Sequence, residues 1–156
     1  MKYQTERLNN GVTFNKFSSD NDLVSILSSR IEMVFKNSLK NNKTLWFVTC
    51  GGNTPKYLLQ ELSKKNINWK NVKVTLTDER LVNIEDTMSN EGMVTHNLLR
   101  GKASSATLYG LCENNDTNKV IISSKLEFLE KVKKIDFLLL GMGEDGHVAS
   151  IFPDDP

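Results

Sequence analysis

The stretch TLWFVTCGGNTPKYLLQEL (Thr44–Leu62) contains the strand, turn and helix that decide the fold. Its first part, Thr44–Cys50, is a short run of β-branched and aromatic residues, which predicts a buried strand. The segment GGNTP ends that strand, and Pro55 favours the first turn of a helix that we expect to continue to about Lys65. A strand followed at once by a helix is the unit from which parallel sheets are built.

The rest of the chain repeats this alternation. Apolar residues keep helical spacing from Asp20 to Lys40, and Asp20 or Asn21 can cap the start of that helix. The other expected elements are a strand at Val72–Thr77, a helix capped by Ser89 that runs through Leu99 and stops at Gly101, a strand at Ala106–Tyr109, a helix from Thr117 to about Lys133, and a strand at Phe137–Leu140. Several strands are uniformly apolar, which is typical of a parallel sheet covered on both faces. The expected fold is therefore α/β, a single domain over residues 1–156 with a Rossmann-like parallel sheet and helices on both faces.

Composition and charge exclude several classes of protein. The 156 residues are 38% hydrophobic and 25% charged, which is typical of a globular protein. A net charge of +1 gives no bulk attraction for nucleic acid or an anionic membrane, and no apolar run approaches membrane-spanning length. Cys50 and Cys112 form no disulfide framework, and the N-terminus lacks the apolar core of a signal peptide. We expect a cytoplasmic protein that binds neither nucleic acid nor membrane.

The glycine pair after the first strand is a candidate anion site. Gly51 and Gly52 allow the backbone to approach a ligand closely, and free N–H groups at the start of the next helix attract phosphate without any net positive charge. The side chains of Asn53 and Thr54 can add hydrogen bonds. A tight turn with Thr54 as helix cap explains the same residues equally well.

Charged residues end the second strand of the alternation. Arg80 is suited to bidentate phosphate binding, and Asp78 or Glu79 could orient a substrate hydroxyl or hold the arginine. A solvated charge cluster is the better interpretation of an isolated D-E-R. Ser89-Asn90 follows close enough in sequence to fold back over the same opening.

The third strand end reads GMGEDGH and matches G-x-G-x-x-G. A dinucleotide-binding turn is disfavoured because only ten residues follow Gly146, too few for the next helix, strand and ribose-binding acid. We expect instead that a glycine turn containing Gly143 presents His147 as a general base, with Asp145 or Glu144 fixing its tautomer. A surface histidine in a charged turn is the alternative. The spacing of the two histidines and two cysteines predicts no metal site.

The segments GGNTPKYLLQEL, VTLTDERLV with SNEGMV, and LLLGMGEDGHVASIFP, in this order, resemble the 6-phosphogluconolactonase family. That family shares its fold with the glucosamine-6-phosphate isomerases and deaminases, which typically have an aromatic residue after the acids of the DER position. Those enzymes also carry phenylalanine, asparagine and a catalytic glutamate where this chain has ASIFP, so both differences favour the lactonase. The family typically has serine at the Asn53 position, and its members continue beyond the FP of Phe152-Pro153, so the chain is expected to lack their C-terminal part.

The resemblance implies hydrolysis of 6-phospho-D-glucono-1,5-lactone to 6-phosphogluconate in the pentose phosphate pathway, without cofactor or metal. It implies His147 as the base and Asp145 as its orienting acid, with Glu144 as the second choice. The substrate contacts it implies are Gly51, Gly52, Asn53, Thr54, Asp78, Arg80, Ser89, Asn90 and Gly143. An amino-sugar phosphate isomerase or deaminase, and a phosphosugar-binding module without catalysis, are the alternatives.

Overall fold

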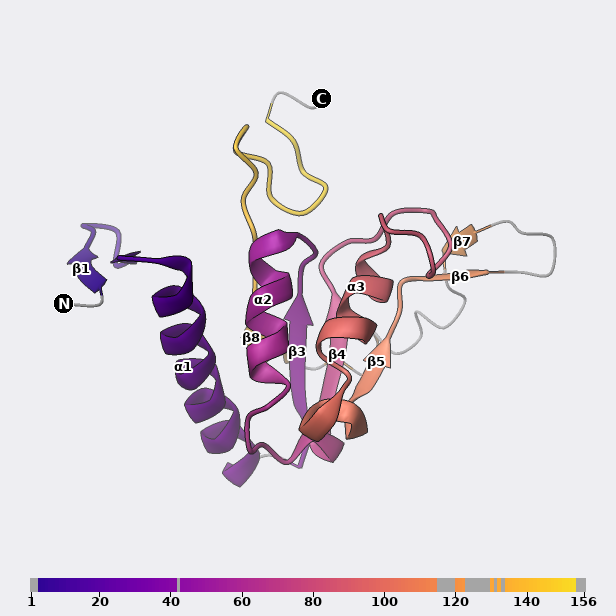
Figure 1. The fold of residues 1–156 in the computed structure, drawn as a ribbon, viewed down its shortest axis with the longest axis horizontal. Helices are drawn as coiled ribbons and strands as arrows, with labels where there is room; N and C mark the ends of the chain where they lie inside the picture. Colours follow the sequence, from indigo (N-terminus) through magenta and orange to yellow (C-terminus); the bar gives the residue numbers. More distant parts are fainter. Residues whose placement is uncertain are drawn as a thin grey trace.

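A four-stranded parallel sheet forms the centre of the molecule. The computed structural model describes residues 3–41, 43–114, 120–122, 130, 132 and 134–153. The sheet has the order β5-β4-β3-β8, and every neighbouring pair is parallel. Its strands are β3 (Leu45–Thr49), β4 (Val72–Leu76), β5 (Thr107–Tyr109) and β8 (Phe137–Leu138). The predicted α/β fold with a parallel sheet is confirmed (Figure 1).

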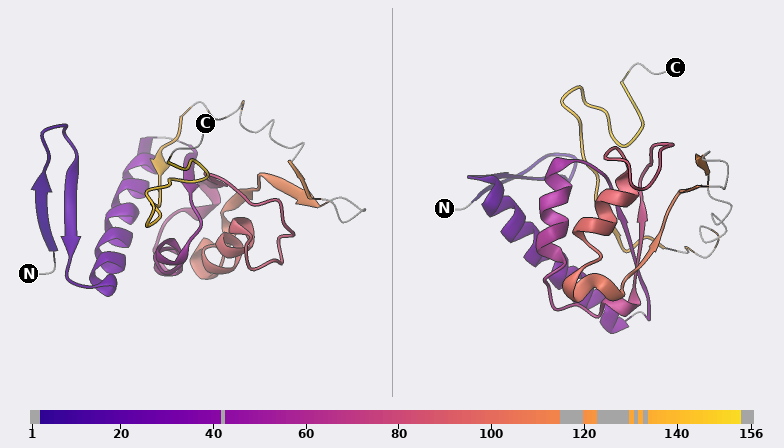
Figure 2. Two further views of the ribbon diagram at one scale, coloured as in Figure 1. Left: turned by 90° about the horizontal axis from the view of Figure 1, so that it is seen from above. Right: turned by 45° about the vertical axis from the view of Figure 1, so that its right-hand side comes forward.

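Three helices pack against one another beside this sheet. They are α1 (Asp20–Asn41), α2 (Asn53–Leu62) and α3 (Asn90–Asn97), and α2 lies between the other two (Figure 2). Two short 3-10 helices precede strands of the sheet: η1 (Trp69–Asn71) leads into β4, and η2 (Gly101–Ser105) leads into β5. No helix in the described ranges is both long and apolar enough to span a membrane.

Several predicted elements differ from the structure. Helix α2 ends at Leu62 rather than at about Lys65, and β8 ends at Leu138 rather than Leu140. The helix expected from Thr117 to Lys133, which would cover the second face of the sheet, falls largely outside the described residues, and at Val120–Ile122 the chain forms strand β7 instead. Three consecutive β-branched residues favour that extended backbone. Helix α3 ends at Asn97 rather than Leu99, and Gly101, with a φ of 54°, begins η2 instead of stopping α3.

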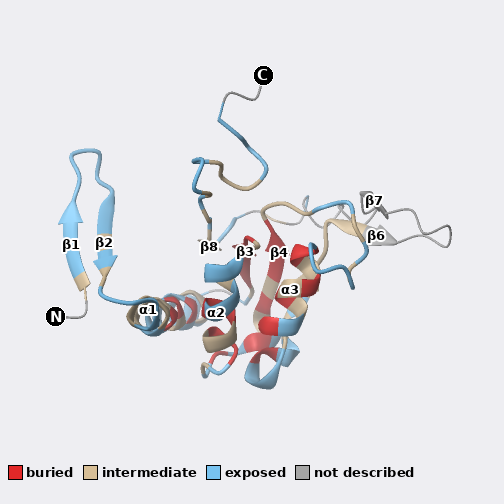
Figure 3. Ribbon diagram, turned by 45° about the horizontal axis from the view of Figure 1, so that its top comes forward, coloured by how far each residue is buried: buried red, intermediate tan, exposed pale blue. Residues whose placement is uncertain are grey.

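The core lies between β3 and the helices. All five residues of β3 are buried, as are the inward faces of α2 and α3 (Figure 3). Phe35 of α1 is fully buried and packs edge-to-face against Phe47, Trp69 and Phe137. These rings join α1, η1 and two adjacent strands into one apolar unit.

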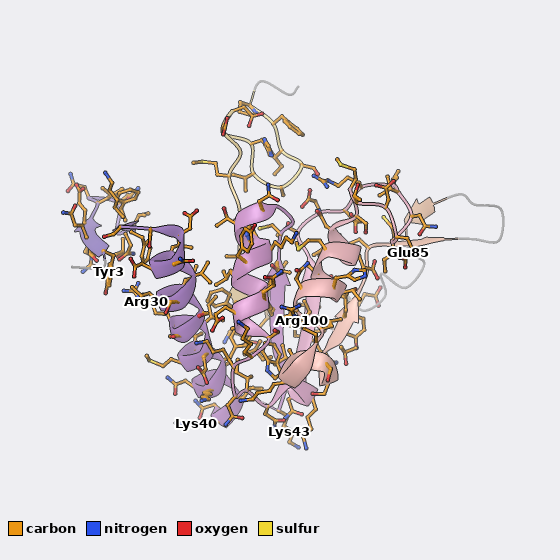
Figure 4. All side chains as sticks on the ribbon, in the orientation of Figure 1. Tyr3, Arg30, Lys40, Lys43, Glu85 and Arg100 are labelled. Atoms are coloured by element: carbon orange, nitrogen blue, oxygen red, sulfur yellow. The ribbon has the colours of Figure 1, made fainter. Side chains whose placement is uncertain are left out.

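Two hairpins extend from this body. Strands β1 (Tyr3–Arg7) and β2 (Thr13–Phe17) form an antiparallel hairpin that was not expected from the sequence, and β6 (Cys112–Asn114) pairs with β7. Arg30 of α1 donates a 2.7 Å hydrogen bond to the Tyr3 hydroxyl and stacks over its ring, which attaches the first hairpin to α1 (Figure 4).

The strand order creates a topological switch point between β3 and β8. The chain moves from β3 outward through β4 to β5 and then returns to the opposite side of β3 as β8. In open parallel sheets ligands bind beyond the carboxyl ends of the strands at such a point. The segments that follow β3 and β8 leave the sheet at this end (Figure 1).

Candidate active site

A pocket of about 480 Å³ lies at the switch point. Its wall comes from the segments that follow β3, β4 and β8, with Leu23 and Leu27 of α1 and Asn90 of α3. Nine of the residues expected from the sequence line it: Gly51, Gly52, Asn53, Thr54, Asp78, Arg80, Asn90, Gly143 and His147. Residues from three separate strand ends therefore face one cavity.

The start of α2 contributes backbone N–H groups to this pocket. Gly52 is the N-cap and has a φ of 107°, in the left-handed region that favours glycine. The first helical turn contains Asn53, Thr54 and Pro55, and its first intrahelical bond is made by the N–H of Lys56 to the Gly52 carbonyl. The N–H groups ahead of Lys56 are thus those that a helix leaves for a ligand at its positive end.

Asp78 joins the end of β4 to the loop that carries His147. Its Oδ1 accepts a 2.8 Å bond from the Thr77 hydroxyl, and its Oδ2 accepts a 2.8 Å bond from the hydroxyl of Ser150. Ser150 belongs to a tight turn in which Val148 and Ile151 exchange two backbone hydrogen bonds of 3.1 and 3.0 Å. The Asp78–Ser150 bond therefore connects two segments that are far apart in the sequence.

Strain accompanies that turn. Ala149 has a φ of 53°, which costs an L-residue roughly 1 kcal/mol, and it lines the pocket. Residues held in such conformations cluster at functional sites, because the surrounding structure must compensate their cost. Here the turn places Ser150 within reach of Asp78.

His147 is half-buried and held by Asp145. The Nδ1 atom of the ring lies 2.5 Å from Asp145 Oδ1, and the same oxygen accepts the backbone N–H of His147 at 3.2 Å. The pKa of Asp145 is lowered, chiefly because its carboxylate accepts that backbone N–H and, next, because it bonds the imidazole. With Nδ1 engaged, the hydrogen-bond pattern assigns the lone pair to Nε2, the atom available to take a proton.

Gly143 makes room for this pair. A Cβ built on Gly143 would overlap the Cε1 and Nδ1 atoms of His147 and would lie 2.6 Å from Asp145 Oδ1. Two backbone bonds, Gly143 N–H to the His147 carbonyl at 2.9 Å and Gly146 N–H to the Gly143 carbonyl at 3.0 Å, close the loop. The ring of Phe152 covers the other side of the imidazole, 4.8 Å away between centroids.

Cys50 is the residue of β3's end that faces both the pocket and the core. It is a free thiol, 4% exposed, and burial raises its pKa. A neutral thiol is a poor nucleophile, so this environment gives Cys50 a packing role beside Gly141.

The remaining expected site residues lie outside the pocket lining. Asp145, rather than Glu144, is the carboxylate that contacts His147, and Glu144 is exposed. Ser89 is buried and caps α3, accepting the N–H of Gly92 at 3.0 Å. Its role as a cap was predicted, whereas its predicted contact with substrate stays a prediction.

Sequence reasoning missed several residues of the site, among them Leu23, Leu27 and Ser150. Leu23 and Leu27 line the pocket from α1, and their spacing of one helical turn was visible in the sequence. The link from Ser150 to Asp78 joins residues too distant in sequence for any local pattern to indicate it.

Comparisons with known proteins found a family and several relatives that this chain resembles. Residues 18–156 match the model of a family described as glucosamine-6-phosphate isomerases/6-phosphogluconolactonase. The chain is 38% identical over 109 residues to a 6-phosphogluconolactonase of Pseudomonas putida, and 41% identical over 108 residues to one of Neisseria meningitidis. These alignments cover 70% and 68% of this chain, but 45% and 47% of the two relatives.

Solved structures show the same relation. A crystal structure of a 6-phosphogluconolactonase from Shewanella baltica superimposes with a TM-score of 0.74 and 31% identity, over 86% of this chain and 58% of the other. A monomeric glucosamine-6-phosphate deaminase shares the fold, with a TM-score of 0.64 and 15% identity. The chain spans about half the length of the two curated relatives from Pseudomonas putida and Neisseria meningitidis.

Proposed function

This chain belongs to the glucosamine-6-phosphate isomerase/6-phosphogluconolactonase family, and from that premise we propose that its pocket hydrolyses 6-phospho-D-glucono-1,5-lactone to 6-phosphogluconate. The observation that carries the proposal is that Gly52, Arg80 and His147 line one pocket. An anion site and a candidate base thereby share a cavity large enough for a phosphorylated sugar.

The phosphate would bind at the start of α2 and at Arg80. Backbone N–H groups of residues 52–54 lie at the start of α2, the positive end of the helix dipole. The guanidinium of Arg80 is exposed and has further N–H donors besides the one that bonds the Met88 carbonyl. Binding the phosphate fixes the lactone carbonyl relative to the base, so that distant binding energy improves orientation at the reacting carbon.

His147 would act as the general base. Its Nε2 takes a proton from water while the water oxygen bonds to the lactone carbonyl carbon, and backbone N–H groups that face the pocket stabilise the tetrahedral oxyanion. The bond from that carbon to the ring oxygen then breaks, and the imidazolium returns its proton to the departing oxygen. One water is consumed and no metal or cofactor is required. The free thiols at Cys50 and Cys112 fit a reducing, cytoplasmic setting for this reaction.

Two substitutions separate the two halves of the proposal. We expect His147→Ala to reduce lactone hydrolysis above the spontaneous rate about a hundredfold or more, with little change in 6-phosphogluconate binding measured by calorimetry. We expect Arg80→Ala to weaken that binding instead. Full turnover in the His147 variant would exclude it as the base, and unchanged affinity in the Arg80 variant would exclude the phosphate assignment.

Two observations identify the alternative functions. Ammonia release from glucosamine 6-phosphate would identify an amino-sugar phosphate deaminase. Binding of 6-phosphogluconate without lactone hydrolysis would identify a phosphosugar-binding module.

A further inference from the structure

Glu79 lies between two pocket residues but does not line the pocket. Its side chain turns toward the start of α3, where one carboxylate accepts four hydrogen bonds. Oε1 accepts the backbone N–H groups of Arg80 at 2.7 Å and Asn90 at 2.8 Å. Oε2 accepts the backbone N–H of Glu91 at 2.6 Å and the hydroxyl of Ser89 at 3.2 Å.

These bonds set the position of Asn90. The Asn90 side chain donates a 3.0 Å bond to the Asp78 carbonyl, and its amide occupies the space where a Cβ of Gly51 would be. Asn90 is 4% exposed and lines the pocket directly beside Gly51. Through Asn90, Glu79 therefore connects the end of β4 to the turn after β3.

The same bonds set the position of Arg80. The carboxylate holds the backbone N–H of Arg80, and the guanidinium donates a 2.5 Å bond to the carbonyl of Met88. Glu79 and Arg80 thus both bond the segment Met88–Glu91 at the start of α3, Arg80 through Met88 and Glu79 through the residues that follow it. Displacing that turn would move the cation that lines the pocket.

We propose that Glu79 is a positioning residue for the phosphorylated substrate: it holds Arg80 and Asn90 in the arrangement that binds the ligand. This role rests on the proposed function. It differs from helix capping alone, because Ser89 is already the N-cap of α3 and bonds Gly92.

The substitution Glu79→Gln tests the role. Glutamine has the same shape, but its amide presents one acceptor and one donor where the structure needs acceptors at both oxygens. We expect KM for the lactone and the Kd for 6-phosphogluconate to rise roughly tenfold or more through misplacement of Arg80 and Asn90, with little change in kcat.

Electrostatics alone predicts the opposite sign. Removing a negative charge near an anion site favours the anion, so without a positioning role Glu79→Gln should bind 6-phosphogluconate as tightly as wild type or more tightly. Weaker binding thus supports positioning, and equal or tighter binding overturns it.

Asn97→Ala is the matched control for lost stability. Asn97 lies at the far end of α3, is 7% exposed and bonds Gln60 at 2.6 Å, so its removal loosens the same helix away from the pocket. We expect a similar fall in thermal midpoint for both variants but an unchanged Kd for Asn97→Ala. A Kd that rises equally in both would overturn the proposal, because loosening α3 anywhere would then suffice. Wild-type protein that neither binds 6-phosphogluconate nor hydrolyses the lactone would refute the proposed function itself. If the wild type does both and Glu79→Gln has the same Kd and KM as the wild type, only the positioning role of Glu79 is refuted.

Discussion

Replacing Gly143 with alanine tests whether the pair formed by His147 and Asp145 is the centre of catalysis. The added Cβ would overlap two atoms of the imidazole and lie 2.6 Å from Asp145 Oδ1. The backbone at Gly143 is outside the left-handed region, so alanine adds no backbone strain and acts only through this overlap.

The structure sets the size of the effect. Ordinary contact begins at 3.4 Å, so the carboxylate oxygen must move by about 1 Å, and the ring by more. A misplacement of about 1 Å at a catalytic group costs roughly a hundredfold in rate. Because Asp145 is exposed, we expect the free energy of unfolding to change by less than about 0.5 kcal/mol.

The assay is kcat for lactone hydrolysis above the spontaneous rate, with thermal unfolding measured in parallel. Gly141→Ala is the control in the same loop, because its Cβ would meet Cys50 Sγ at 3.5 Å, an ordinary contact. We expect near wild-type turnover for Gly141→Ala and a large loss for Gly143→Ala. Wild-type turnover in the Gly143 variant would refute the reasoning, since the ring pair could then move freely without consequence.

Three further predictions concern the loop, the core and pH. Ser150→Ala removes the bond to Asp78 and should lower kcat about threefold to tenfold with a loss of stability near 1 kcal/mol; unchanged kcat would show that the link does not position the loop. Phe35→Ala should cost about 3–5 kcal/mol in denaturant unfolding, since the ring is fully buried among three aromatic residues, and a cost near zero would contradict that packing. Burial raises the pKa of Cys50, so its neutral form stabilises the fold below the ordinary thiol pKa of about 8.5, and this contribution is lost as pH rises. The thermal midpoint should therefore fall more between neutral and alkaline pH in wild type than in Cys50→Ala, and equal falls would argue against it.

Local sequence patterns were sufficient for most of the sheet. The β-branched and aromatic run at 44–50 and the helical periodicity of 20–40 predicted β3 and α1 to within about one residue, because burial and period coincide there. The hairpin at 3–17 escaped prediction because its strands are mostly exposed and polar, with little apolar alternation. At Val120–Ile122 the same periodicity argument was wrong, since a short β-branched run fits helix and strand spacing alike.

The candidate site was predictable in its parts but not in its connections. Strand-end position was enough to bring the glycine pair, Arg80 and His147 to one cavity, because carboxyl ends of parallel strands share an edge. Asp145 was expected ahead of Glu144 as the partner of His147, and it is Asp145 that contacts the ring. The backbone bonds through Gly143 and Gly146 that close the loop were not predicted, because no local rule specifies them. Their roles in chemistry stay predictions.

Asp78 and Glu79 are negatively charged residues beside the proposed anion site, where they would repel a bound phosphate if their carboxylates had no other partners. Asp78 accepts hydrogen bonds from the hydroxyls of Thr77 and Ser150. Glu79 accepts four hydrogen bonds, one from the backbone N–H of Arg80 and three from donors at the start of α3. Each carboxylate is thus bound by protein donors and holds a segment that carries pocket residues. Arg80 retains N–H donors for a ligand. The start of α2 also attracts an anion through the helix dipole, which requires no additional charged side chain. Three consecutive charged residues can therefore serve separate purposes, which explains how a chain with a net charge of +1 can build a local anion site.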